Sequence, residues 1–168
     1  MSKQIEIERK YVIKKPSPEV MKMQSEYTES EITQVYLTSE SGVTHRVRKR
    51  VFANGAVYTE TKKIRIDRMS AVEEEREISE ETYESLCEKI DEETQPVIKK
   101  RYTFFYSGVT FEIDVYPNWE RTAIMETELE NREVSVKMPS FIEIVREVTG
   151  ERGYSNAAMA RVFPPELI

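Results

Sequence analysis

The sequence predicts a mainly β protein of the α+β class, a closed eight-stranded antiparallel β-barrel with helices packed outside it. About eight segments alternate charged and apolar residues, which is the pattern of β-strands. Most of them follow one another across short turns, which favours antiparallel pairing. A few further segments have a helical period and an apolar stripe that can cover the barrel. No linker interrupts the 168 residues, so a single domain, 1–168, is expected.

Each predicted strand is bounded by turn-forming or helical residues. Asn54-Gly55 is the strongest hairpin signal and joins the third strand to the fourth. The predicted strands are Gln4–Ile13, Glu31–Thr38, Val43–Phe52, Ala56–Ile64, Ala71–Ile78, Val97–Tyr106, Val109–Tyr116 and Ala123–Asn131.

Helices are predicted in three regions. A short helix is expected at Pro18–Ser25, after a proline break, and a second begins after Ser79, a residue type that caps helix N-termini. From Ser140 onward the period again becomes helical, and a last short helix is expected at Ser155–Val162. The predicted inward residues are Val20, Met21 and Met23 in the first helix, Tyr83, Leu86, Cys87 and Ile90 in the second, and Phe141, Ile144, Val145 and Val148 in the third region.

Composition excludes several classes of protein. The net charge of −6 argues against a bulk nucleic-acid binder, which would carry a basic surplus. The single cysteine, Cys87, rules out an intrachain disulfide framework and a cysteine-based zinc site. No apolar run approaches the ~20 residues of a membrane span, and the first residues lack the apolar core of a signal peptide. We therefore expect a cytoplasmic protein without a membrane or nucleic-acid partner.

Six segments carry two like charges spaced two residues apart. Side chains two apart on a strand share a face and lie roughly 6–7 Å from each other, so each pair is repulsive. A face in water would gain more from opposite charges side by side. If these strands share one enclosed lumen, the basic pairs suit a polyanion and the acidic pairs suit divalent metal ions. The pairs are Glu6-x-Glu8, Arg46-x-Arg48, Glu73-x-Glu75, Lys99-x-Arg101, Glu112-x-Asp114 and Glu126-x-Glu128.

The sign of each pair predicts its ligand. Carboxylate oxygens select magnesium or manganese, and arginine binds phosphate through two hydrogen bonds. Only one of the neighbours Lys62 and Lys63 can face the lumen, and we select Lys62. The candidate metal ligands are Glu6, Glu8, Asp114, Glu126 and Glu128, and the candidate phosphate ligands are Arg46, Arg48, Lys62, Lys99 and Arg101.

The ExExK motif, residues 6–10, is similar to that of the CYTH family, the triphosphate tunnel metalloenzymes. Other segments resemble the family in the same order along nearly the whole chain. They are Gln34–Leu37, Arg46–Arg48, Lys99–Tyr102, Phe111–Tyr116, Met125–Leu129, Glu147–Thr149 and Tyr154–Asn156. Two departures stand out: Ala71 lies where an arginine is expected, and the family's T-x-K pattern fits Thr61–Lys63 only if Lys63 faces inward.

The resemblance implies an eight-stranded tunnel that binds a triphosphate together with magnesium or manganese. By position, it implies metal ligation by Glu6, Glu8, Glu126 and Glu128, a contribution of Lys10 at the tunnel mouth, and a place for Glu73 and Glu75 in the substrate site. We assign catalysis to Glu6, Glu8, Lys10 and Glu128. His45 is expected to point away from the tunnel, and Tyr154–Asn156 to cap the last helix.

Metal-assisted hydrolysis of inorganic tripolyphosphate is the favoured reaction. The alternatives are a class IV adenylate cyclase, in which the ribose 3′-oxygen attacks the α-phosphorus of ATP, a thiamine triphosphatase, and a non-catalytic polyphosphate-binding module. The sequence contains no distinctive base-recognition motif. The expected partner is a small-molecule triphosphate, and the resemblance also suggests a homodimer.

Overall fold

The computed structural model describes residues 2–168, with side chains from Lys3 onward. The strands are β1 Ser2–Lys14, β2 Ser25–Leu37, β3 Val43–Phe52, β4 Gly55–Arg65, β5 Ser70–Ile78, β6 Val97–Tyr106, β7 Val109–Val115, β8 Thr122–Glu128 and β9 Ile144–Glu147. The helices are α1 Pro18–Lys22, α2 Glu80–Cys87 and α3 Asn156–Arg161, and η1 is a 3₁₀ turn at Arg152–Tyr154. No helix of the described residues is long and apolar enough to cross a membrane.

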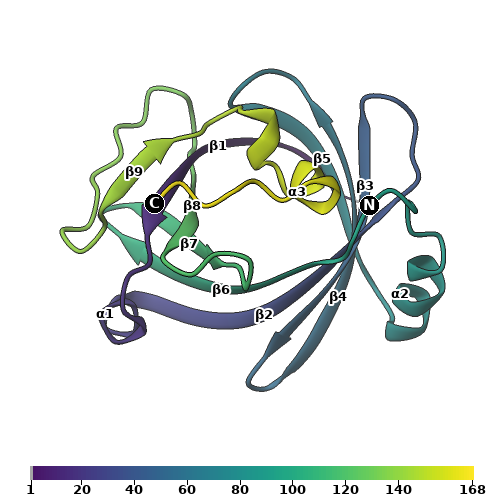
Figure 1. Cartoon of the computed structure of the whole chain (residues 1–168), viewed down its shortest axis with the longest axis horizontal. Helices are drawn as coiled ribbons and strands as arrows, with labels where there is room; N and C mark the ends of the chain where they lie inside the picture. Colours follow the sequence, from purple (N-terminus) through teal and green to yellow (C-terminus); the bar gives the residue numbers. More distant parts are fainter. Residues whose placement is uncertain (1) are drawn as a thin grey trace.

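The strands close into a ring (Figure 1). All pairings are antiparallel, in the order β5-β4-β3-β2-β6-β7-β8-β1-β9, and a further β5–β1 pairing closes the ring of β1 to β8. The predicted closed eight-stranded antiparallel barrel is therefore confirmed.

The long strand β1 changes its neighbour halfway along. Its residues Ser2–Ile7 pair with β5, while Glu8–Lys14 pair with β8 on the other side. One edge of β1 is therefore left free beyond Ile7, and β9 pairs with that edge at Tyr11–Ile13. The helix predicted from Ser140 is thus wrong, because β9 supplies hydrogen bonds to a strand edge that would otherwise have none.

The first helix is shorter than predicted, and β2 begins earlier. Ser17 caps α1 by accepting a hydrogen bond from the Val20 N–H, and α1 ends at Lys22. Strand β2 then starts at Ser25 with an irregular register, and Glu26 has a φ of 54°. A β-bulge of this kind turns the chain into the sheet without a loop.

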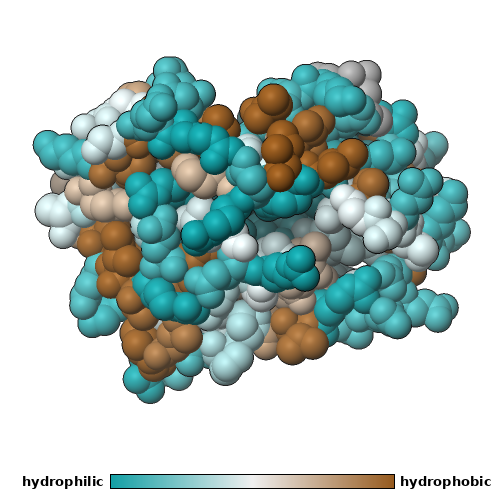
Figure 2. Space-filling model, turned by 90° about the horizontal axis from the view of Figure 1, so that it is seen from above, coloured by the Kyte–Doolittle hydropathy of each residue, from teal (hydrophilic) through white to brown (hydrophobic). Residues whose placement is uncertain are grey.

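The barrel carries its apolar side chains outward. The largest outer cluster is centred on Tyr11, Ile13, Phe104, Phe111 and Met125. The segment from Val134 to Ile142 and helix α1 pack over it, while α2 covers a second cluster around Val47 and Tyr83. The face drawn in Figure 2 is largely hydrophilic, with separate hydrophobic patches. The like-charged pairs have the opposite parity to these apolar residues and face the lumen.

Helix α3 closes one end of the barrel instead of covering its outside (Figure 1). Met159 and Ala160 of α3 pack against the lumen-facing Val12, Tyr36 and Tyr116. Ser155 caps the helix by accepting a hydrogen bond from the Ala158 N–H at 3.1 Å, as the sequence predicts. The lumen therefore has an apolar, filled end next to α3 and a polar remainder.

Candidate functional site

The predicted charge pairs share the lumen-facing side of their strands. Their side chains contact one another across strand pairs, and most are at least partly buried. Two further cations, Arg50 of β3 and Lys63 of β4, have the same parity as predicted lumen residues. Most of these charged side chains form ion pairs with each other. The side chains that lack an ion-pair partner are the candidates for ligand binding.

Lys63, and not Lys62, is the lysine of β4 that faces the lumen. Its ammonium lies 3.3 Å from Glu6 Oε2 and 3.9 Å from Glu73 Oε2. Lys62 pairs in register with His45 and Glu74, which belong to the outer side of the sheet. The selection of Lys62 is therefore wrong, and the T-x-K spacing from Thr61 to Lys63 is the one that the fold uses.

Glu6 and Glu73 share this lysine, and their pKa values shift in opposite directions. Burial raises the pKa of Glu73 to about 7, helped by its hydrogen bond with Glu6. Burial also acts on Glu6, but the Lys63 ammonium and the same hydrogen bond outweigh it, so the pKa of Glu6 falls. Beside them, Glu75 accepts a hydrogen bond of 2.8 Å from the Thr61 hydroxyl.

Asp114 is enclosed by two cations. Its two oxygens lie 2.7 and 2.9 Å from Arg101 Nε and Nη2, and its Oδ2 is also 2.8 Å from Lys99 Nζ. Burial raises the pKa of Asp114, but Arg101 and Lys99 outweigh it and hold that pKa well below its ordinary value. The metal-ligand role predicted for Asp114 does not fit this arrangement, because both oxygens already bind cations. Glu112 pairs with the third nitrogen of Arg101 at 2.8 Å.

Lys10 and Glu126 form a second neutralised pair, 3.2 Å apart. The Lys10 ammonium also donates to the Tyr154 carbonyl at 3.1 Å, so it lies close to the segment that leads into α3. Burial raises the pKa of Glu126, yet Lys10 and then Arg101 lower it to about 2. Glu126 is therefore ionised, with its charge already matched by neighbouring cations.

The arginines of β3 have no carboxylate partner. Among the described residues, no Asp or Glu oxygen lies within 4.0 Å of the Arg46, Arg48 or Arg50 guanidinium. The Gln34 side-chain oxygen instead accepts from Arg48 Nε and Nη2 at 3.0 and 2.6 Å, and Arg46 Nε is buried without any hydrogen bond. Burial, with repulsion from Arg46 and Arg101, lowers the pKa of Arg48 to about 9. Cations without a direct carboxylate partner suit an anion site.

Glu8 and Glu128 are the matching uncompensated anions. They are directly paired residues of β1 and β8, and neither has a basic nitrogen within 4.0 Å in the described part of the chain. The charge of Glu126, and then burial, raises the pKa of Glu8. Burial and then the Glu112 charge raise the pKa of Glu128 to about 7. Crowded carboxylates of this kind gain when a cation arrives.

The arginines of β3 and the Glu8–Glu128 pair lie on opposite sides of the ring of strands. From β3 the ring runs through β2, β6 and β7 to β8 in one direction, and through β4, β5 and β1 to β8 in the other. Strands β3 and β8 are thus four steps apart either way, on opposite walls of the lumen. One wall offers cations to an anion, and the other offers carboxylates to a metal ion.

The residues fit a magnesium or manganese ion that is shared with a ligand. Between residues 2 and 168, no group of three or more His, Cys, Asp or Glu side chains converges closely enough to hold a metal by itself. Magnesium commonly binds one or two carboxylates and completes its shell with phosphate oxygens and water. Glu8 and Glu128 supply the hard oxygen donors that such a site needs.

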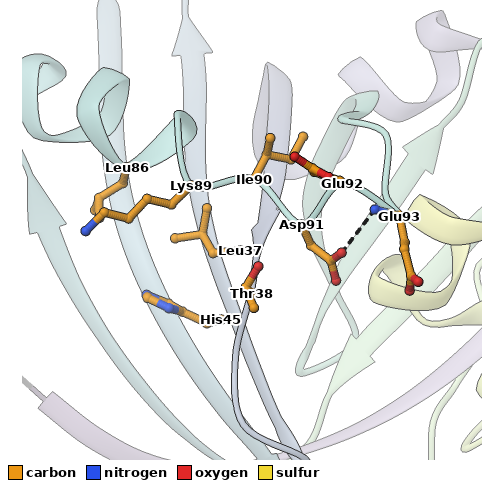
Figure 3. Close-up of a pocket in the computed structure, with 9 residues that line it drawn as sticks. All are labelled: Leu37, Thr38, His45, Leu86, Lys89, Ile90, Asp91, Glu92 and Glu93. Carbon is orange, nitrogen blue, oxygen red and sulfur yellow. Dashed lines mark hydrogen bonds between the residues drawn. The ribbon is translucent and has the colours of Figure 1, made fainter.

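A surface cavity of ≈580 Å³ lies outside the barrel, beside α2 (Figure 3). His45 reaches it, which confirms that this histidine points away from the lumen; its Nε2 lies 2.7 Å from Glu60 Oε2. The cavity is lined by Leu37, Thr38, His45, Leu86, Lys89, Ile90, Asp91, Glu92 and Glu93. Its acidic rim makes it a poor site for a polyanion.

Sequence reasoning missed Arg50 and Asn156. Arg50 continues the alternation of Arg46 and Arg48 by one more step, so the parity rule itself was signal enough. Asn156 Oδ1 accepts hydrogen bonds from Tyr116 Oη at 2.7 Å and Lys99 Nζ at 3.4 Å. No spacing in the sequence predicts that contact, because it depends on where α3 docks.

The strands form a closed β-barrel tunnel whose lumen has opposed charged walls, and solved structures share the barrel fold. The inorganic triphosphatase NE1496 is similar over 95% of this chain and 97% of its own, with 25% identity and a TM-score of 0.61. PH1012 from Pyrococcus horikoshii shares the fold, with 24% identity and a TM-score of 0.57 over 76% of this chain and 81% of its own. HpAC1 from Hippeastrum also shares the fold, with 16% identity and a TM-score of 0.50 over 76% of this chain and 81% of its own. No protein-family model and no curated protein sequence matches the chain. The structural likenesses confirm the resemblance to the triphosphate tunnel metalloenzymes.

Proposed function

We propose that this protein is a metal-dependent triphosphatase whose substrate is inorganic tripolyphosphate. The observation that carries the proposal is the pair of opposed walls, with the arginines of β3 lacking carboxylate partners and Glu8 and Glu128 lacking cations. A triphosphate with its metal ion supplies both missing charges at once. The inorganic triphosphatase NE1496, which is similar over nearly its whole length, supports the same activity.

Magnesium or manganese is the proposed cofactor, held by Glu8 and Glu128 with Glu6 nearby. The bound ion would neutralise charge on the phosphate oxygens and promote ionisation of a water molecule. The protein's own contribution is to hold the phosphate chain straight. Arg46 and Arg48 bind the nonbridging oxygens, and the neutral Gln34 side chain fixes the Arg48 guanidinium.

Phosphoryl transfer depends on positioning and charge neutralisation more than on covalent chemistry. The oxygen of a water molecule attacks the terminal phosphorus, the bridging P–O bond breaks, and pyrophosphate leaves. A carboxylate beside the metal site accepts the proton from that water, as general-base catalysis requires. The cationic wall stabilises the charge that develops on the leaving pyrophosphate.

The test is a substrate panel: tripolyphosphate, thiamine triphosphate and ATP, each with magnesium, manganese or EDTA, with phosphate and cyclic AMP measured. We expect metal-dependent release of phosphate from tripolyphosphate at the highest kcat/KM. Glu8→Gln is expected to lower that kcat/KM at least about 100-fold, since a metal ligand is lost.

The matched control is Glu130→Gln, an exposed carboxylate just beyond β8, which should retain wild-type turnover. Cyclic AMP as the main product would replace the proposal by an adenylate cyclase. Tight tripolyphosphate binding without any turnover would instead favour a non-catalytic module.

A further inference from the structure

The main chain of Lys10 lies on β1 between two strand pairings. The pairing with β5 ends at Ile7, and the pairing with β9 begins at Tyr11. Lys10 is held by the residues just after β9 instead. The Val148 N–H donates to the Lys10 carbonyl at 2.8 Å, and the Lys10 N–H donates to the Thr149 hydroxyl at 3.0 Å. A side-chain oxygen thus supplies the acceptor that a neighbouring strand would otherwise provide.

The Thr149 hydroxyl is also fixed from its other side. Thr149 is buried, and the closest acceptor for its hydroxyl proton is Glu147 Oε1, 3.0 Å away. The Glu147 carboxylate in turn accepts from Arg9 Nε and Nη2 at 2.9 and 3.1 Å. Because the hydroxyl proton is directed at Glu147, a lone pair is left for the Lys10 N–H. Arg68 Nη2 donates to the Thr149 carbonyl at 2.9 Å and anchors the main chain.

The Lys10 ammonium is only partly satisfied by the protein. Its Nζ lies 3.2 Å from Glu126 Oε1 and donates to the Tyr154 carbonyl at 3.1 Å. An ammonium has three N–H groups, and among residues 2–168 no third acceptor contacts this one. Lys10 shares the lumen-facing parity of Glu8, and its side chain is 12% exposed. One N–H is therefore available to a phosphate oxygen in the lumen.

We infer that Thr149 is a positioning residue of the triphosphate site, which acts through Lys10 without touching the substrate. By holding the Lys10 N–H, it fixes the point of β1 from which the ammonium projects, so less conformational freedom is lost when the phosphate chain binds. The inference rests on the proposed triphosphatase function and extends it to a residue outside the lumen. It also gives the Glu147–Thr149 segment a role that the charge pairs do not supply.

The test measures the affinity for tripolyphosphate by calorimetry in metal-free buffer. Thr149→Val keeps the side-chain shape but removes the hydroxyl, and should weaken binding about fivefold, the size of one lost hydrogen bond. With magnesium, KM should rise by the same factor while kcat changes less than about twofold. Thr149→Ser keeps the hydroxyl and should restore wild-type affinity.

Two comparisons separate positioning from a purely structural role. In a Lys10→Met background, Thr149→Val should weaken binding no further, because its effect passes through the missing ammonium. Thr127→Val is the matched control: Thr127 is also buried, and its hydroxyl has no hydrogen-bond partner in the described part of the chain. It should bind tripolyphosphate as the wild type does.

Wild-type affinity in Thr149→Val, or an equal loss with and without Lys10, overturns the inference and leaves the triphosphatase intact. If Thr149→Val does not fold, Thr149→Ala repeats the comparison. A wild type that binds tripolyphosphate but does not hydrolyse it contradicts the proposed function, and the affinities still decide the role of Thr149. A wild type that does not bind tripolyphosphate overturns both.

Discussion

At the scale of single residues, the lumen separates neutralised charges from uncompensated ones. Lys99, Arg101 and Asp114 satisfy one another in a buried network. Glu8 and Glu128 have no such cation, and their raised pKa values show that the fold holds two carboxylates where ionising both is unfavourable. Binding sites often retain this kind of local instability, because the ligand relieves it.

The instability gives Glu128 a pH-dependent effect on folding. Because the folded-state pKa is raised to about 7 from 4.5, the protonated form favours folding, and that stability is present below pH 4.5 and lost as the pH rises through 7. In EDTA at pH 8, Glu128→Gln should raise the free energy of unfolding by up to about 1 kcal/mol, a small figure since Glu128 is exposed and water screens the repulsion.

Urea denaturation at pH 5 and pH 8 measures the effect. The gain should shrink at pH 5, and Glu130→Gln should show no gain at either pH. A Glu128→Gln protein that is less stable than wild type at pH 8 would contradict the assignment of Glu128 as an uncompensated carboxylate.

Lys62 and Lys63 provide a paired test of strand parity. Lys63 contacts Glu6 and Glu73, whereas Lys62 projects outward. Lys63→Ala leaves those carboxylates without their cation, so kcat/KM for tripolyphosphate should fall about tenfold or more. Lys62→Ala should retain wild-type kcat/KM. Equal losses in the two variants would show that this face of β4 is assigned incorrectly.

At the scale of elements, the C-terminal strap from Phe163 to Ile168 fastens α3 in place. The Glu166 carboxylate accepts hydrogen bonds from the backbone N–H groups of Glu120, Arg121 and Thr122 at 3.0, 2.6 and 2.7 Å. Trp119 Nε1 also donates to the Pro164 carbonyl at 2.9 Å. Burial raises the pKa of Glu166, but the N–H groups of Arg121 and Glu120 outweigh it and lower the pKa to about 2.

Glu166→Gln should therefore loosen the strap and α3 together. We expect faster amide hydrogen exchange at Arg121, Thr122 and the α3 residues, with exchange in β3 and β4 unchanged. Glu120→Gln alters a neighbouring carboxylate and leaves its backbone N–H in place, so its exchange should match wild type. Uniform acceleration across the barrel would mean that the strap stabilises the whole fold and not α3 in particular.

The strands with strict alternation were predictable, because parity alone decides which side chains enter the lumen. The same rule failed at Lys62 and Lys63, since two adjacent lysines give no alternation to choose by. Strand β9 was missed because Ile144, Val145 and Val148 fit a helical stripe as well as a strand. The choice between helix and strand depends on the free edge of β1, with which β9 pairs. No local sequence pattern reveals that edge.

The separation of neutralised from uncompensated charges was not predictable either. Asp114 and Glu128 are both acidic residues of E-x-D or E-x-E pairs, and their spacing is the same. Asp114 is enclosed by Lys99 and Arg101 because β6 and β7 are paired in that register, whereas Glu128 is paired with Glu8. The chemistry of each carboxylate is therefore set by its cross-strand neighbour.

At the scale of the whole molecule, the barrel combines covered apolar clusters on its outside, a charged lumen and one filled end. We propose that the walls of β3 and β8 together bind a triphosphate and its metal ion. Crystals of the protein with manganese and tripolyphosphate, measured at the manganese absorption edge, provide the direct test. We expect anomalous peaks beside the Glu8 and Glu128 oxygens, with phosphate oxygens on Arg46 and Arg48. A manganese peak at Asp114, or a phosphate chain bound outside the barrel, would contradict it.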